Sequence, residues 1–135
     1  MSKLEIPVYL ASSSPRRKEL LQQIGVDFHI VTPNIDESLH ENESPEAYVR
    51  RMAEEKAKVG LDMIQGEGLI IGSDTSVVLD DHILGKPVDL NDAIAMLERL
   101  SGRSHRVMTA VAMINHKHHQ LSRLSVNEVH FRNLT

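Results

Sequence analysis

Short runs of apolar residues, separated by polar stretches, predict several short strands along the chain. Val8–Ala11, Phe28–Val31 and Leu69–Ile71 are apolar runs of a length typical of buried strands. A fourth run, Val77–Leu79, follows the polar stretch Gly72–Thr75. We therefore expect Gly72–Thr75 to leave the end of one buried strand and to lead into the next.

Amphipathic stretches between these runs predict three helices. The first two have a serine cap followed by proline, which suits the first helical turn, and Ser14 and Ser44 are these caps. Glycine is common just past a helix end. We expect helices from Pro15 to near Gly25, from Pro45 to near Gly60, and over Asp92–Leu100. The polar segment Thr32–Glu43 is expected to be an ordered loop.

Two hairpins complete the predicted pattern. Asp80–Asp81 fits a tight turn, and Val107–Ile114 and Leu121–Phe131 are the arms of a longer hairpin around Asn115–His119. The histidines of this turn could suggest a metal site, but a polar hairpin tip explains them. Alternating helices and short strands predict an α/β domain with a mixed, twisted sheet and flanking helices. The chain ends at Thr135 without a closing helix, so we expect it to be interrupted there.

Composition excludes several classes of protein. A chain of 135 residues suits one domain over 1–135, and the lack of Cys excludes disulfides and thiolate chemistry. A net charge of −4 and an aromatic content of 3% argue against nucleic-acid binding, which relies on basic residues and base stacking. No secretion signal or bilayer-length apolar run is present, so we expect a cytoplasmic protein without a membrane partner.

The segment Leu10–Arg17, with the sequence LASSSPRR, is the first candidate for chemistry. A strand that leads into a helix N-terminus offers free N–H groups and the positive end of the helix dipole to an anion. Arg16 and Arg17 add positive charge there, although that charge opposes the dipole. These residues alone are equally compatible with an anion site and with an exposed basic helix start.

Asp74 is the second candidate, because it directly follows a buried apolar run and Gly72-Ser73. A carboxylate near the core needs a cation, a metal or several N–H donors, since an unpaired buried charge is costly. Asp74 could therefore hold Mg²⁺ or activate a water molecule. The alternative is an Asx turn at the strand end, with Asp74 bonded only to the local backbone.

Further polar groups could complete a phosphate and metal site. Asp36 and Glu37 lie in the polar loop and could bind a metal, although loop acids are more often simply solvated. Lys56 belongs to a charged run but shares a helical face with apolar residues, so we expect it to face a cleft. Lys86 lies in a rigid Gly-Lys-Pro loop. Cations for a polyphosphate and carboxylates for a metal are what phosphoanhydride cleavage requires.

The motifs LASSSPRR, IDE, EKA, GSDT, GKP and LSGRSHRVMTAV resemble, in order and spacing, those of the Maf family of nucleotide pyrophosphatases. The resemblance covers nearly the whole chain. It implies hydrolysis of nucleoside triphosphates between the α- and β-phosphates with a divalent metal such as Mg²⁺ or Mn²⁺. It also implies a two-lobed fold like that of inosine triphosphate pyrophosphatases, with a cleft between the lobes, and a homodimer.

Position by position, the resemblance implies a role for each candidate residue. Asp74 matches the proton acceptor of the family and, together with Glu37, the residues that handle the metal. The other matches concern the substrate. The resemblance implies that three cations hold the phosphates, namely Arg17, Lys56 and Lys86. It also implies that Ser12 lines the loop and that Arg16 and Thr75 contribute to base selectivity.

The same residues imply a branch of the family. Arg16-Arg17 and Asp74-Thr75 are similar to the branch that acts on dTTP and UTP, which implies these and modified pyrimidine nucleotides as substrates. A related branch that acts on 7-methyl-GTP has Trp in place of Arg16 and Gln in place of Thr75. Family members continue past the position of Thr135, so we expect an incomplete second lobe. The alternative is a non-catalytic nucleotide-binding regulator linked to septum formation or division arrest.

Overall fold

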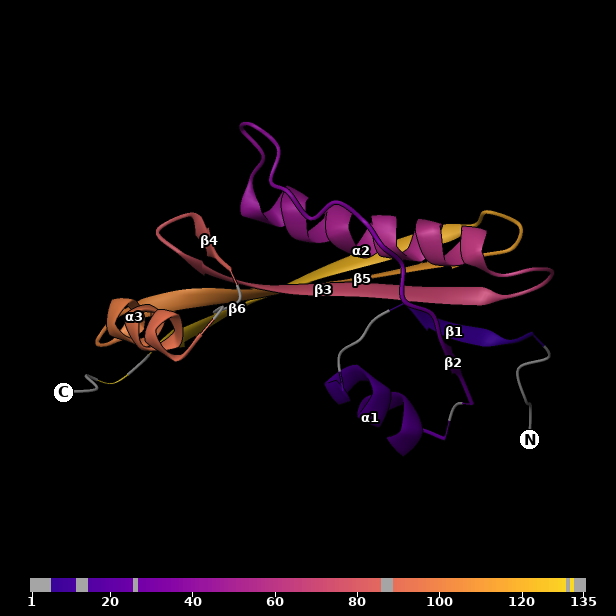
Figure 1. Cartoon of the computed structure of the whole chain (residues 1–135), viewed down its shortest axis with the longest axis horizontal. Coiled ribbons are helices and arrows are strands. Elements are labelled where there is room, and N and C mark those ends of the chain that lie inside the picture. Colours follow the sequence, from indigo (N-terminus) through magenta and orange to yellow (C-terminus); the bar gives the residue numbers. More distant parts are fainter. Residues whose placement is uncertain (1–5, 12–14, 26, 86–88, 131, 133–135) are drawn as a thin grey trace.

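The computed structural model describes residues 6–11, 15–25, 27–85, 89–130 and 132, without the side chains of 15–17 and 21. No helix in these residues is long and apolar enough to cross a membrane. Figure 1 shows the elements, which are β1 (Val8–Ala11), α1 (Pro15–Gln23), β2 (His29–Ile30), α2 (Pro45–Met63), β3 (Leu69–Leu79), β4 (His82–Leu84), α3 (Leu90–Leu100), β5 (Ser104–Asn115) and β6 (Gln120–His130).

The strands form one mixed sheet, as the sequence predicts, in the order β2-β1-β3-β5-β6 with β4 paired to β3. β1 runs parallel to both β2 and β3, whereas β3, β5 and β6 are antiparallel neighbours. The register between β3 and β5 extends from Leu69↔Asn115 to Val78↔Arg106. β3 therefore lies in the middle of the sheet, with a parallel partner on one side and an antiparallel partner on the other.

Helix α2 covers one face of β3 and β5 and supplies the main core (Figure 1). Its small residues allow a close approach to the strand at Gly72. A Cβ added at Gly72 would lie 2.4 Å from the carbonyl oxygen of Ala53 and 2.7 Å from the nitrogen of Ala57. The fully buried side chains packed between these elements include Val49, Ala53, Ile70, Val78, Met108 and Ala110.

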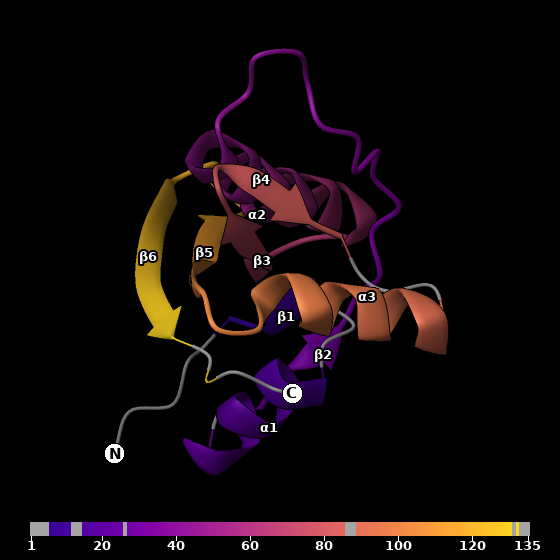
Figure 2. The ribbon, with the colours of Figure 1, turned by 90° about the vertical axis from the view of Figure 1, so that its left-hand side faces the viewer.

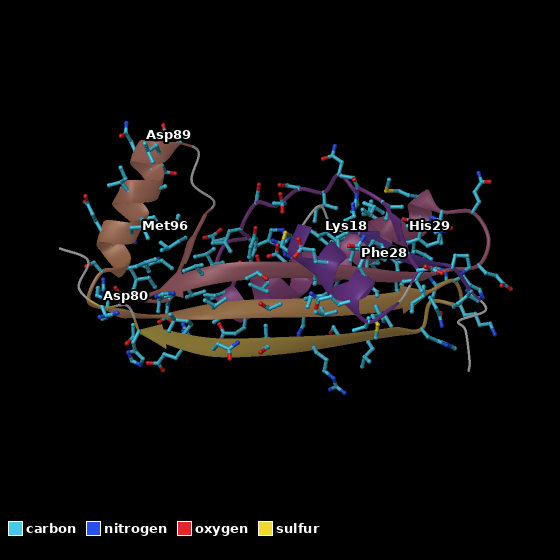
Figure 3. The ribbon with its side chains drawn as sticks, turned by 90° about the horizontal axis from the view of Figure 1, so that it is seen from below. Lys18, Phe28, His29, Asp80, Asp89 and Met96 are labelled. Atoms are coloured by element: carbon cyan, nitrogen blue, oxygen red, sulfur yellow. The ribbon has the colours of Figure 1, made fainter. Side chains whose placement is uncertain are left out.

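Helices α1 and α3 lie on the opposite side of the sheet from α2, as the end view in Figure 2 shows. They are separated along the strands in Figure 3, where Lys18 marks α1 and Met96 marks α3. A second, smaller core forms where α3 meets the end of β3 and the strand β4. Its buried members are Leu79, Leu84 and Leu100.

Side-chain caps set the starts of the helices. Ser44 Oγ accepts a hydrogen bond from the Ala47 nitrogen at 3.1 Å, which confirms the predicted cap of α2. Asp89 Oδ1 accepts from the Asp92 nitrogen at 2.8 Å, so α3 begins two residues earlier than predicted. The predicted cap Ser14 lies outside the described residues, and Gly25 follows α1 with a φ of 76°.

The main correction to the sequence prediction concerns the stretch Gly72–Thr75. It lies inside the single strand β3, because Gly72 pairs with Ala11 of β1 and with Ala112 of β5. The predicted Asp80–Asp81 turn is confirmed, with positive φ angles at both residues. Strand β2 is shorter than the apolar run that predicts it, and α2 extends past Gly60 to Met63.

Candidate active site

Asp74 lies in the middle of β3 and on the face that α2 covers. Side chains alternate along a strand, so Asp74 shares this face with Ile70 and with the position of Gly72. Its side chain is 16% exposed, which leaves the carboxylate at the edge of the core. The expectation that Asp74 follows the end of the strand is therefore wrong, since the pairing with β5 continues to Val78.

Lys56 of α2 reaches this carboxylate from above the sheet. It lies between Ala53 and Ala57, the two residues that approach Gly72, so its side chain is directed at the neighbouring part of β3. Its Nζ donates hydrogen bonds to Asp74 Oδ1 at 3.1 Å and to the Ser73 carbonyl oxygen at 3.3 Å. A cation thus compensates the charge of Asp74, and the alternative of an Asx turn is wrong.

Glu37 brings a second carboxylate to the same ammonium group from the loop between β2 and α2. Its Oε1 lies 3.8 Å from Lys56 Nζ, and its side chain is 62% exposed. Two acids and one base therefore meet at the edge of the core, and their formal charges leave a net charge of −1. The structure brings together three of the predicted site residues, from β3, from α2 and from the loop between β2 and α2.

The carboxylates of Glu37 and Asp74 fit a divalent metal. Mg²⁺ in nucleotide enzymes is bound by one or two carboxylates together with the phosphates of the substrate, which supply the other oxygen ligands. Among the described residues, no group of three or more acids and histidines could hold a metal ion. A metal at this site would consequently need oxygen ligands beyond those two carboxylates, such as phosphates.

Thr75 directly follows Asp74 in β3, so its side chain is on the opposite face of the strand. Its hydroxyl shares a hydrogen bond of 3.1 Å with the hydroxyl of Thr109, the residue directly opposite on β5. The sequence analysis does not single out Thr109. Thr109 could be found only from the register of β3 against β5, and a single sequence does not specify that register.

The other predicted site residues are only partly placed. Arg16 and Arg17 lie in the first turn of α1, where the structure describes the backbone but not their side chains. Ser12 and Lys86 lie outside the described residues. Their predicted roles toward the phosphates and the base remain predictions.

Residues 7–135 match the family described as Maf-like protein. The chain belongs to the Maf family. The match covers all the motifs on which the resemblance depends, so the resemblance is confirmed at the level of the family.

Curated relatives of this Maf protein carry a more specific name. A dTTP/UTP pyrophosphatase of Xanthomonas axonopodis pv. citri (strain 306) is 47% identical over 130 residues, which cover 94% of this chain and 68% of that protein. A dTTP/UTP pyrophosphatase of Alkalilimnicola ehrlichii is 46% identical over 132 residues, covering 94% of this chain and 64% of that protein. The chain spans about two thirds of the length of these relatives.

Solved structures confirm the fold. A HAM1 protein from Coxiella burnetii matches with a TM-score of 0.57 at 19% identity, over 91% of this chain and 71% of that one. A nucleoside-triphosphatase, dITP/XTP pyrophosphatase from Mycobacterium abscessus matches with a TM-score of 0.56 at 16% identity, over 91% and 72%. The Maf protein thus has the fold of the inosine triphosphate pyrophosphatase class, as expected.

Two residues of α2 that the sequence analysis does not select hold the loop of Glu37. Tyr48 Oη donates to the Glu37 carbonyl oxygen at 2.6 Å. Arg51 Nη2 donates to the Ser38 carbonyl oxygen at 2.8 Å, and Arg51 Nε forms an ion pair of 2.7 Å with Glu43. Both residues lie in the part of α2 that precedes Lys56, on a helix whose start the Ser44 cap defines.

The Arg51–Glu43 pair makes the loop sensitive to acid. The hydrogen bonds of Arg51, opposed by burial, lower the pKa of Glu43 from 4.5 to about 2. Because the folded-state pKa is the lower one, the pair stabilises the protein above about pH 4.5, and this contribution is lost as the pH falls toward about 2. The same pair raises the pKa of Arg51, which stays charged throughout.

We therefore expect Glu43→Gln to lower the free energy of unfolding near neutral pH and to have progressively less effect in acid. Urea unfolding of both proteins between pH 7 and pH 3 measures the difference. Glu41→Gln, at an exposed position of the same loop, is the matched control and should change little. A difference between wild type and Glu43→Gln that does not shrink below pH 4.5 would contradict the role of this ion pair.

Proposed function

We propose that this Maf protein hydrolyses nucleoside triphosphates between the α- and β-phosphates, with dTTP, UTP and modified pyrimidine nucleotides as substrates. The products are the nucleoside monophosphate and pyrophosphate. The observation that carries the proposal is the ammonium group of Lys56, 3.1 Å from Asp74 and 3.8 Å from Glu37. The names of relatives that are 46–47% identical support the choice of nucleotide.

Asp74 is the proposed proton acceptor. The oxygen of a water molecule bonds to the α-phosphorus while Asp74 takes a proton from it, and the bond from that phosphorus to the bridging oxygen breaks. The electron pair of the broken bond leaves with pyrophosphate. Asp74 is held by Lys56 and by the strand pairing on both sides of β3, so its carboxylate keeps a defined orientation.

Lys56 is the proposed counter-charge for the triphosphate. Its side chain is 19% exposed, so its ammonium group can also contact a phosphate oxygen. A fixed cation stabilises the negative charge that develops on the departing pyrophosphate. Arg17 and Lys86 are proposed to act on the same phosphates, Ser12 to line their loop, and Arg16 and Thr75 to select the base.

Glu37 and Asp74 are the proposed ligands of a divalent metal, Mg²⁺ or Mn²⁺. When bound, such an ion would act as a Lewis acid toward the phosphate oxygens. Asp74, Glu37 and Lys56 together carry a formal charge of −1, which the metal ion would balance. Glu37 is the more exposed of the two carboxylates and is therefore the more accessible to an incoming metal ion.

We also propose that residues 1–135 act as one nucleotide pyrophosphatase domain in a cytoplasmic homodimer, without nucleic acid or membrane as partner. The acidic net charge of −4 supports the absence of a nucleic-acid partner. The alternative, a non-catalytic regulator of cell division, is not favoured, because the curated relatives are named as enzymes.

A nucleotide panel tests the proposed function. The purified chain is incubated with Mg²⁺ or Mn²⁺ and each of dTTP, UTP, dCTP, ATP and GTP, and the products are separated by ion exchange. We expect kcat/KM for dTTP and UTP to exceed that for the purine nucleotides by about tenfold or more, with pyrophosphate as the co-product and no turnover in EDTA. Release of orthophosphate, or equal turnover of all five nucleotides, would contradict the proposal.

A further inference from the structure

Glu37 is placed in a segment that has no helix or strand of its own. Residues 31–44 connect β2 to α2, and Asp36, Glu37 and Ser38 are all exposed. An exposed loop of this length normally samples many conformations, which would spread the Glu37 carboxylate over a wide volume. Its position near Lys56 therefore requires specific contacts that hold the loop.

Both polar groups of the peptide bond between Glu37 and Ser38 are hydrogen bonded. The Glu37 carbonyl oxygen accepts from Tyr48 Oη at 2.6 Å. The Ser38 nitrogen donates to Asp36 Oδ1 at 2.9 Å, and Ser38 Oγ donates to the same oxygen at 2.6 Å. A peptide plane that is bonded on both sides cannot rotate freely, so it restricts the direction in which the Glu37 side chain leaves the backbone.

The next carbonyl group along the loop is held as well. The Ser38 carbonyl oxygen accepts from Arg51 Nη2 at 2.8 Å, and the same guanidinium group makes two hydrogen bonds to the carboxylate of Glu43, at 2.7 and 2.9 Å. Arg51 lies one helical turn after Tyr48, and its guanidinium carbon is 5.5 Å from the centre of the Tyr48 ring. The two side chains thus form one contiguous unit on α2.

We propose that Tyr48 and Arg51 form a clamp that holds the carbonyl groups of Glu37 and Ser38 and thereby positions the Glu37 carboxylate for its metal. They are positioning residues, because they bind backbone carbonyl groups of the loop and act through Glu37. The proposal rests on the proposed function, in which Glu37 is a metal ligand. Residues that orient a metal ligand in this way typically change metal affinity by about 10–100-fold when they are removed.

The burial of Tyr48 is consistent with this role. The Tyr48 ring is partly buried and packs against the core beneath α2, which holds its hydroxyl in place against the Glu37 carbonyl oxygen. The guanidinium group of Arg51 offers a planar set of donors that a lysine at this position would lack.

The test compares wild type with Tyr48→Phe, Arg51→Met and the double variant, and uses Arg50→Met, an exposed neighbour on α2, as the matched control. The first readout is amide hydrogen exchange of residues 35–43 in protein free of metal and nucleotide. We expect exchange in the double variant to be about tenfold faster in this loop, with β3 and β5 unchanged, and no change in Arg50→Met.

The second readout is Mn²⁺ affinity, measured by electron paramagnetic resonance in the presence of α,β-methylene dTTP. We expect the double variant to bind Mn²⁺ about 10–100-fold more weakly, while its kcat for dTTP at saturating Mn²⁺ stays close to that of wild type. Unchanged loop exchange overturns the clamp, and faster exchange with unchanged Mn²⁺ affinity overturns its positioning role. Faster exchange in the double variant together with no dTTP hydrolysis by wild type supports the clamp and overturns the proposed function.

Discussion

Asp74→Asn is expected to lower kcat for dTTP by about 10²–10⁴-fold, the usual contribution of a general base. Asn has nearly the volume of Asp and can still accept a hydrogen bond from Lys56, whose Nζ lies 3.1 Å from Asp74 Oδ1. It cannot take a proton from water and carries no charge for a metal. The change therefore removes the chemistry while it preserves the packing between α2 and β3.

Asp81→Asn is the matched control for this variant. Asp81 is exposed in the turn between β3 and β4, where it pairs with Arg106. Its replacement by Asn should therefore leave kcat unchanged. Initial rates with dTTP and Mg²⁺, together with thermal unfolding of each protein, separate a catalytic loss from a folding defect. If Asp74→Asn keeps its kcat within a factor of about three while Asp81→Asn behaves as wild type, another group accepts the proton.

Gly72→Ala is expected to lower the free energy of unfolding by about 1–3 kcal/mol or more. A methyl group in a strand would otherwise stabilise the protein by about 0.5–1 kcal/mol through backbone entropy. Here the steric clash outweighs this gain and makes the substitution destabilising, because the added Cβ would lie 2.4 Å from the Ala53 carbonyl oxygen and 2.7 Å from the Ala57 nitrogen. These are backbone atoms, so the whole helix α2 has to move away from β3.

The same movement should reduce activity, since Lys56 lies on α2 between Ala53 and Ala57 and meets Asp74 on β3. Gly85→Ala is the control for stability, because no atom of the described residues, its chain neighbours aside, lies within 4 Å of the added Cβ. Urea unfolding measures both variants, and kcat/KM for dTTP is measured for Gly72→Ala at a temperature where it remains folded. A Gly72→Ala protein as stable as wild type would show that the close approach of α2 does not define the site.

Much of the fold follows from local signals in the sequence. The pair Ser44-Pro45 marks the start of α2 because a serine cap and a first-turn proline act within a few residues of each other. The Asp80–Asp81 turn is equally local. The orientation of Lys56 is also predicted, since Met52 and Ala53 on the same helical face are fully buried against the sheet.

The middle of β3 is where such local signals fail. Gly72-Ser73-Asp74-Thr75 has the polar composition of a loop, and only its partners on β1 and β5 show that it is part of a strand. These partners are distant in sequence, so the local pattern of apolar and polar residues does not predict them. The burial that makes Asp74 need a cation comes from α2, which approaches because residue 72 has no side chain.

The contacts that hold the loop of Glu37 are non-local for the same reason. Tyr48 reaches a carbonyl group 11 residues earlier and Arg51 one 13 residues earlier, and the acceptors are backbone atoms. Every residue has a backbone carbonyl group, so the amino-acid types in the loop do not reveal which ones are bonded. The family resemblance selects Glu37 but says nothing about how its position is maintained.

The most direct test of the proposed reaction is hydrolysis of dTTP by the wild-type protein in water enriched in oxygen-18. Attack of water on the α-phosphorus predicts that one labelled oxygen enters dTMP and that pyrophosphate carries no label, which mass spectrometry of the two products measures. Label in pyrophosphate, or release of dTDP with orthophosphate, would contradict cleavage between the α- and β-phosphates by the site that Asp74, Lys56 and Glu37 form.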